Sequence, residues 1–147
     1  PALYPLIYQT SGLDILLVRL TPLQRTDNPT RSIDIIDRLS EITFNASLIS
    51  EMRAIAFVKR LIDKQKLDRG RYKPLHMHMV ADDAGMSAFN ASSKFNTDWA
   101  FLQELHRLGH QAADGWLKAH RDRVGHDSSF DIHAAFLQQL GPASSHS

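Results

Sequence analysis

A short unbroken aliphatic run near the start of the chain sets the first limit on the fold. The run is Ile15-Leu16-Leu17-Val18; it follows Ser11-Gly12 and is closed by Pro22. It is too short to cross a bilayer, and its β-forming residues favour a strand over a helix. Because it is apolar without alternation, it predicts a strand covered on both faces, as in the middle of a parallel sheet.

A loop and a long helix are expected after this strand. Residues 21–30 hold two prolines and Asp27-Asn28, which indicate a loop. From about residue 31 to residue 66, apolar side chains recur at spacings of three and four, which predicts a helix with its apolar face on the core. The weaker pattern over residues 43–47 leaves a kink, or two abutting helices, open. The first members of the expected core face are Ile35, Ile36, Leu39 and Ile42.

A second strand and further helices complete the expected order. The alternating segment Leu75-His76-Met77-His78-Met79-Val80 predicts a strand, which would make a βαβ unit with the first. Thr97 or Asp98 is a suitable N-cap for a helix, and Ser128 or Ser129 for a shorter one. The apolar side of the longer helix would carry Trp99, Leu102, Leu105, Leu108, Ala112 and Trp116, and that of the shorter one Ile132, Phe136, Leu137 and Leu140.

The expected fold class is therefore α/β. It is a partial three-layer α/β/α arrangement, the strand–long helix–strand of a parallel sheet, followed by a helical C-terminal region. Residues 1–80 would form the α/β portion, residues 81–142 a helical extension and residues 143–147 a disordered tail. Two parallel strands leave both sheet edges open, and the apolar start Pro1–Tyr8 needs burial. We therefore expect a piece of a larger α/β protein.

Composition excludes several functional classes. The formal net charge is +1, from 17 basic and 16 acidic residues that are interspersed, so no field attracts nucleic acid. The absence of Cys removes thiolate nucleophiles and disulfides. No apolar stretch is long enough for a transmembrane helix. Nucleotide-binding fingerprints are also missing, so no cofactor is expected.

One serine lies in a motif that is close to a nucleophile elbow. Gly85-Met86-Ser87-Ala88-Phe89 follows the second expected strand. The G-x-S-x-G elbow needs a small residue at the position that Phe89 occupies. The elbow also places its Ser directly at the strand end, whereas Ser87 lies several residues beyond it. An ordinary loop serine therefore explains Ser87 better than a catalytic one.

Eight histidines raise the possibility of a metal site. His76 and His78 share one face of a strand, and His106 and His110 share one face of a helix, with Asp114 continuing it. The helical pair lacks the Glu of H-E-x-x-H, and nothing in the sequence brings the two pairs together. Solvated or interface histidines are the simpler interpretation, so no metal ligand is assigned.

Two further patterns are weak. The tripeptide His120-Arg121-Asp122 resembles a kinase catalytic loop, but Asp127 stands where Asn is required. Trp99 and Trp116 suggest a membrane-surface helix, yet the opposite helix face mixes both charge signs. Packing of this helix on the protein body is the better interpretation.

Two groups of segments carry a family resemblance. The first group is Pro1-Ala2-Leu3-Tyr4-Pro5-Leu6, Ile15-Leu16-Leu17-Val18 with Thr21-Pro22, and Glu41-Ile42-Thr43-Phe44-Asn45-Ala46-Ser47-Leu48 running into Glu51-Met52-Arg53-Ala54-Ile55. The second group runs from Ser92 to Lys94, through Asp98-Trp99-Ala100-Phe101-Leu102, to Ala112-Ala113-Asp114. The first group resembles the later part of bacterial patatin-like phospholipases, and the second resembles the uncharacterised C-terminal domain that follows the patatin domain in one bacterial branch.

The resemblance implies a serine lipid acyl hydrolase with a Ser–Asp dyad. Neither dyad motif stands here, since Asp114-Gly115 is followed by Trp116, so the dyad would lie upstream and no catalytic residue is assigned. The expected partners are the upstream part of the same protein and its lipid or ester substrate, in the cytoplasm or at a membrane periphery. Homo-oligomerisation stays open. The alternatives are a non-enzymatic helical interaction or dimerisation module and, more weakly, a histidine metal-binding domain.

Overall fold

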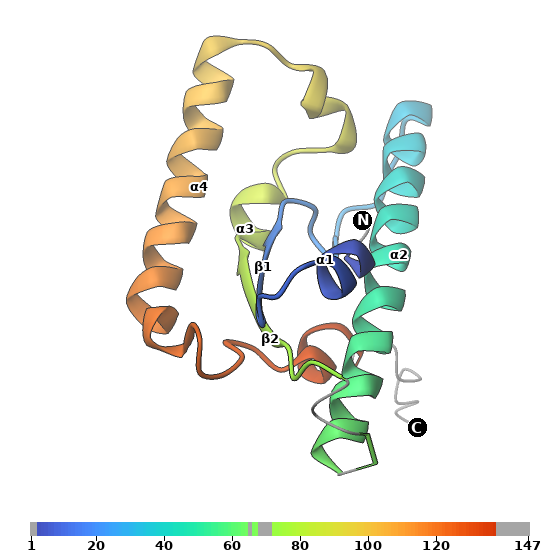
Figure 1. The fold of residues 1–147 in the computed structure, drawn as a ribbon. Coiled ribbons are helices and arrows are strands. Elements are labelled where there is room, and N and C mark those ends of the chain that lie inside the picture. Colours follow the sequence, from blue (N-terminus) through green and yellow to red (C-terminus); the bar gives the residue numbers. More distant parts are fainter. Residues whose placement is uncertain (1–2, 65, 68–71, 138–147) are drawn as a thin grey trace, which may run out of the picture.

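The protein has three layers around a small parallel sheet. The computed structural model describes residues 3–64, 66–67 and 72–137. Strands β1 (Asp14–Arg19) and β2 (His76–Ala81) lie between helix α2 (Ser32–Asp63) on one side and helix α4 (Trp99–His120) on the other (Figure 1). The predicted α/β class, with strand, long helix, strand and a helical C-terminal region, is confirmed.

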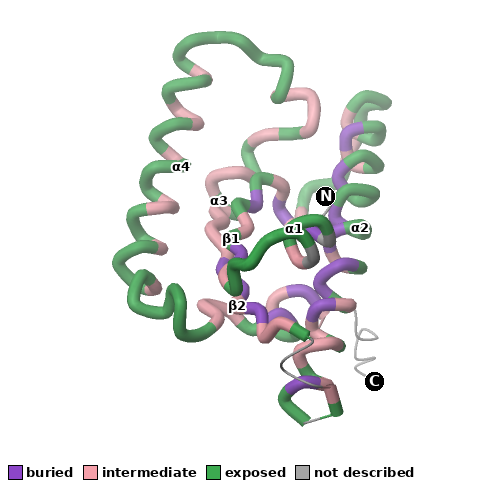
Figure 2. The backbone as a smooth tube through the Cα atoms, viewed as in Figure 1, coloured by how far each residue is buried: buried purple, intermediate pink, exposed green. Residues whose placement is uncertain are grey.

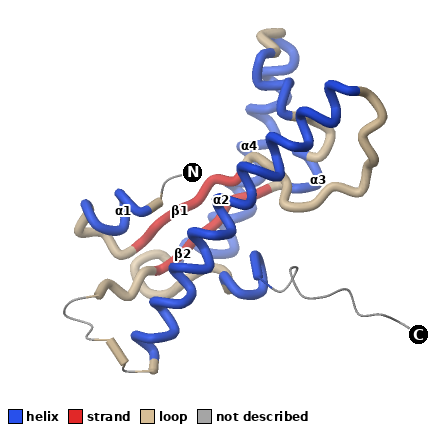
Figure 3. Tube along the Cα trace, turned by 90° about the vertical axis from the view of Figure 1, so that its right-hand side faces the viewer, coloured by secondary structure: helices blue, strands red, loops and turns tan. Residues whose placement is uncertain are grey.

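The two strands pair in parallel, in direct register. Asp14 lies beside His76 and Arg19 beside Ala81, and the His76 amide donates to the Leu13 carbonyl at 2.8 Å. Both strands end within one residue of the predicted segments. The predicted loop between β1 and α2 is also present (Figure 3).

Short helical elements connect the layers. These are α1 (Tyr4–Gln9), α3 (Asp83–Met86), the 3-10 turns η1 (Ala91–Phe95) and η2 (Arg121–Arg123), and the π-type turn η3 (His133–Leu137). Helix α1 was not predicted; Pro5 in its first turn suits a helix start because its missing N–H is not needed there. The expected disordered tail and Leu140 lie outside the described residues.

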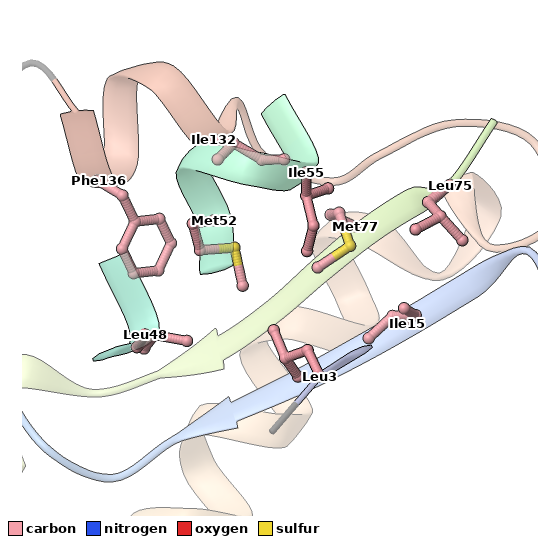
Figure 4. Packing of buried hydrophobic residues seen from close by; sticks show 9 residues of the cluster. All are labelled: Leu3, Ile15, Leu48, Met52, Ile55, Leu75, Met77, Ile132 and Phe136. Atoms are coloured by element: carbon pink, nitrogen blue, oxygen red, sulfur yellow. The ribbon is translucent and has the colours of Figure 1, made fainter. Parts of the chain in front are cut away.

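A compact apolar core fills the space between α2 and the sheet (Figure 4). Leu48, Met52 and Ile55 of α2 pack there against Ile15 and Met77. Because Met52 and Met77 are fully buried, removal of either would leave a cavity. The other buried members are Leu3, Leu75, Ile132 and Phe136.

The first half of α2 has buried positions along one side (Figure 2), and those positions carry polar residues. Asp37, Glu41 and Asn45 are buried, whereas the residues expected on the core are 47% to 59% exposed. The prediction of an inward apolar face is therefore wrong for Ile35, Ile36, Leu39 and Ile42. The kink that residues 43–47 left open is absent, since α2 is continuous.

Helix α4 covers the other face of the sheet only lightly. Its N-cap is Asp98, as one alternative predicted, and the Asp98 carboxylate accepts from the Phe101 amide at 3.0 Å. None of its residues is fully buried. Four of the residues expected on its inward side are half-buried: Leu105, Leu108, Ala112 and Trp116. The prediction is wrong for Trp99 and Leu102, which are 71% and 41% exposed.

Candidate functional site

The outer face of β1 is apolar and open. Ile15 and Arg19 point to the α2 side and are buried, whereas Leu16 and Val18 on the opposite face are 52% and 60% exposed. The prediction that both faces of this strand are covered is wrong within the described part of the chain. Helix α4 lies over β2 and leaves β1 uncovered because its inward side chains meet His78 instead.

The two edges of the sheet are treated differently. At β2, the Met77 amide donates to Ser128 Oγ at 3.0 Å, and the Ser129 amide donates to the Met77 carbonyl at 3.0 Å. The predicted N-cap role of Ser128 is therefore wrong, because its hydroxyl binds the strand edge. Within the described ranges, β1 has β2 as its single neighbouring strand. The sheet is thus open at β1, on both its edge and its outer face.

An Asp–His cluster lies on the α4 side of the same strands. Asp14 Oδ1 is 2.9 Å from His78 Nε2 and 3.4 Å from His76 Nδ1. The same oxygen accepts from the Gly125 amide at 2.8 Å, where a φ of +83° suits glycine. The cluster therefore joins both strands to the segment that follows α4.

The contacts of Asp14 favour its ionised form. The hydrogen bond with His78 lowers the pKa of the Asp14 carboxyl most, and the Gly125 amide lowers it further. Desolvation acts in the opposite direction but is outweighed, since the side chain keeps 28% exposure. A carboxylate that stays charged well below neutral pH therefore anchors the cluster.

Two residues of α4 extend the cluster. The Trp116 ring lies edge-on to the His78 ring, and their centroids are 5.7 Å apart. The centroid of the His120 ring is 5.9 Å from that of Trp116. Trp116 Nε1 and the Nδ1 atoms of His78 and His120 are buried without a hydrogen-bond partner among the described residues. His78 is 1% exposed, so its imidazole is closed off from a substrate in solution.

The predicted histidine pairs do not meet. His76 and His78 do share one side of β2, around Asp14, but the α4 side chain that contacts His78 is Trp116, which in turn lies beside His120. His106 and His110 pair with each other on exposed turns of α4, with ring centroids 6.1 Å apart. Across the described ranges, no three His, Asp or Glu side chains are placed to hold one metal ion.

Ser87 lies at the exposed end of α3. Its hydroxyl donates to the Ala84 carbonyl at 2.8 Å, and no histidine or carboxylate is bonded to it in the described structure. Local packing explains why residue 85 is a glycine. A Cβ there would approach Asp82 Oδ2 to 2.3 Å, and the Asp82 carboxylate accepts a hydrogen bond from the Gly85 amide. The motif therefore reflects a capped turn.

The remaining weak motifs stay apart from the cluster or at its margin. His120 contributes its ring to the cluster, while Arg121 and Asp122 are exposed in η2. Trp99 stands at the exposed start of α4, far along the helix from Trp116. None of the helices in the described ranges combines the length and apolarity needed to cross a membrane.

A buried ion pair lies beyond the carboxyl end of β1. Arg25 donates to both carboxylate oxygens of Glu41 at 2.7 Å, and the two side chains are 8% and 9% exposed. Arg25 also donates to the carbonyls of Ser87 and Phe89. It borders a cavity of about 420 Å³ lined mainly by apolar side chains, among them Leu20, Phe44 and Phe101. Ligands of parallel sheets often bind at this end.

Sequence reasoning missed Asp14, Gly125 and the Arg25–Glu41 pair. The sequence held only slight signals for them. Asp14 is a single acid before an aliphatic run, and Gly125 is an isolated glycine after a helix. The pairing of residues far apart in the chain carries no local pattern.

Comparisons with known proteins identify no relative. No family model, no curated protein and no solved structure matches the chain.

Proposed function

We propose that this chain forms the sheet-completing C-terminal portion of a larger α/β lipid acyl hydrolase of the patatin-like type. The Ser–Asp dyad would come from further α/β structure that packs beside β1. The chain itself would complete the fold and support association. The lipid or ester substrate belongs to the whole enzyme.

The open outer face of β1 carries this proposal. Parallel sheets are almost always covered on both faces. Leu16, Val18 and Leu20 are nevertheless 52%, 60% and 65% exposed, next to a strand edge with no neighbour in the described ranges. Additional strands and a helix beside β1 would bury these side chains. The hydrolase class itself is supported by the sequence resemblance alone.

The DNA upstream of the Pro1 codon tests the proposal. An in-frame D-G-G or D-G-A motif shortly before it, with G-x-S-x-G further upstream, is the expected result. A start codon at that place would contradict it.

A labelling experiment tests the same point on the protein. The product expressed from the natural start codon should react with a fluorophosphonate probe at an upstream Ser, and residues 1–147 should remain unlabelled. Labelling at Ser87 would place the nucleophile in this chain instead.

A paired substitution tests the covering of β1. In that longer product, Val18→Lys should reduce soluble yield and ester hydrolysis, because it would bury a charge. The control is Lys118→Ala, which removes a side chain that is 79% exposed. Equal behaviour of the two variants would show that β1 stays uncovered.

The alternative function is a non-enzymatic interaction or dimerisation module. The exposed apolar residues on the first half of α2 favour it, since large apolar patches on a surface mark contact sites. A histidine metal-binding role remains the weaker alternative. Metal analysis of the purified, dialysed protein tests this role, which requires that the protein retain a stoichiometric amount of metal.

A further inference from the structure

The last turns of α2 and the chain that follows them are strongly basic. Residues 59–73 contain seven basic and two acidic residues, which gives this segment a net charge of +5. The remainder of the chain contains ten basic and fourteen acidic residues, a net charge of −4. The net charge of +1 for the whole chain therefore conceals one positive region, which can attract an anionic partner.

Part of this charge lies on the outward face of α2. Arg53, Phe57 and Arg60 of the helix and its C-cap residue Lys64 follow one another at spacings of four, three and four residues, and all four are exposed. At 3.6 residues per turn they form one line about 16 Å long, which is rotated by roughly 150° from the buried positions in the same half of the helix. The line therefore faces away from the core.

Most of these cations have no anionic partner. The side chains of Arg53, Lys64 and Lys66 make no hydrogen bond or ion pair with any described residue. The guanidinium carbon of Arg60 lies 5.6 Å from the centroid of the Phe57 ring. Attraction to the helix dipole explains cations in the last turn alone, and Arg53 lies ten residues before the end of α2. Their charge is therefore available to an outside partner.

A further cation approaches from the segment after α4. Arg123 of η2 borders a cavity of about 960 Å³, which the last turns of α2 also border. Five basic residues line this cavity against three acids, Asp63, Asp127 and Asp131, and Asp63 is paired with Lys59 at 3.9 Å. The end of α2 projects beyond the sheet (Figure 1). We call this region the basic end; its residues are Arg53, Lys59, Arg60, Lys64, Lys66 and Arg123.

We propose that the basic end docks on the surface of an anionic lipid bilayer. Clusters of four to eight Lys and Arg residues bind anionic headgroups, because each cation gains energy close to the negatively charged surface. Phe57 is 52% exposed in the middle of the basic line, and aromatic rings are favoured at the level of the headgroups. The cations would bind lipid phosphates while the Phe57 ring lies among the headgroups.

The charge of the rest of the chain favours a membrane over a nucleic acid. A nucleic acid strand is a long polyanion whose affinity depends on many phosphate contacts along its length. Such a strand would pass along surfaces outside residues 59–73, where acids outnumber basic residues. A flat bilayer touches only the projecting end, and acids more than about 8 Å away are screened from it by physiological salt.

Vesicle co-sedimentation of the 147-residue chain tests the proposal. The chain should bind vesicles of phosphatidylcholine mixed with phosphatidylglycerol, more weakly as salt is raised, and should not bind pure phosphatidylcholine vesicles. The double variant Lys64→Glu with Lys66→Glu should weaken binding at least about tenfold. The control, Lys94→Glu with Arg107→Glu, makes the same change in net charge on η1 and α4 and should leave binding within about twofold. Circular dichroism confirms that both variants fold.

Three results would overturn the proposal. The first is that the wild-type chain fails to bind the mixed vesicles or binds both kinds of vesicle equally. The second is that the two double variants lose binding equally. The third is that a double-stranded oligonucleotide binds more tightly than the mixed vesicles and is lost in Lys64→Glu with Lys66→Glu, which would assign the basic end to nucleic acid.

A fluorescent label tests the orientation on the bilayer, because the chain has no Cys of its own. An environment-sensitive dye on Phe57→Cys should shift its emission to shorter wavelength on the mixed vesicles, and the same dye on Lys94→Cys should not. A shift at Lys94→Cys alone would overturn docking through the basic end. None of these outcomes bears on the upstream dyad or on the outer face of β1.

Discussion

The Arg25 guanidinium donates to both carboxylate oxygens of Glu41 at 2.7 Å, and both side chains are almost fully buried. This pair ties the loop after β1 to the inward face of α2. It explains why the helix turns a charged residue toward the protein. Arg25 lies sixteen residues before Glu41 in the chain, so neither residue is part of the other's local pattern.

Removing one member of the pair should be costly. Arg25→Ala is expected to lower the free energy of unfolding by about 3 kcal/mol, because Glu41 would remain buried without a counter-charge. The double variant Arg25→Met with Glu41→Leu should recover part of this loss. Urea denaturation of all three proteins measures it. A loss in the double variant larger than that in Arg25→Ala would contradict this role of the pair.

The Asp14 carboxylate should stabilise the fold in a pH-dependent way. Its folded-state pKa is lowered by His78 and Gly125, so its contribution is present above the unfolded pKa and is lost as pH falls through the folded one. Asp14→Asn should cost about 1–2 kcal/mol at neutral pH. The difference from wild type should shrink as the pH is lowered below roughly 4.

Thermal unfolding over pH 2.5–7, roughly the range in which carboxyls titrate, measures this difference. Asp122→Asn is the control, since Asp122 lies exposed in η2. A cost for Asp14→Asn that is constant down to the lowest pH would show that the charge of Asp14 is unimportant.

Two glycines should respond oppositely to alanine. Gly125 has a φ of +83°, so Gly125→Ala is expected to destabilise by about 1 kcal/mol and to disturb the bond to Asp14. Gly109 lies inside α4, and an added Cβ there would meet no atom within 4 Å. Gly109→Ala should therefore stabilise by about 0.5–1 kcal/mol. Calorimetric melting of both variants tests the contrast, and a shift of the same sign in both would contradict it.

The segment after α4 should be integral to the core. Phe136 of η3 is 1% exposed and belongs to the cluster formed with Leu48 and Met52. Phe136→Ala should cost about 3–5 kcal/mol through lost burial and a cavity. His133→Ala, an exposed neighbour, should have little effect. Equal unfolding midpoints in urea would show that this segment does not support the core.

Local pattern alone determined the two strands and the two long helices of this protein, β1, β2, α2 and α4, but not the short helix α1. The aliphatic run of β1, the alternation of β2 and the long apolar periodicity of α2 each predicted their element to within a few residues. This succeeds because strand and helix periods, caps and turn residues act over a few neighbouring positions. Asp98 capped α4 as one alternative predicted for the same reason.

Tertiary structure alone decided which faces are buried and which polar groups meet. Helical periodicity placed Leu39 and Ile42 inside, but Arg25, Ser92 and the Pro22 carbonyl approach from other segments and bind the opposite, polar side of α2. Likewise, Asp14 meets His78 and Gly125 through sheet register and the return of the chain after α4. Burial of a polar side chain depends on a partner that is distant in sequence, and no local pattern records that partner.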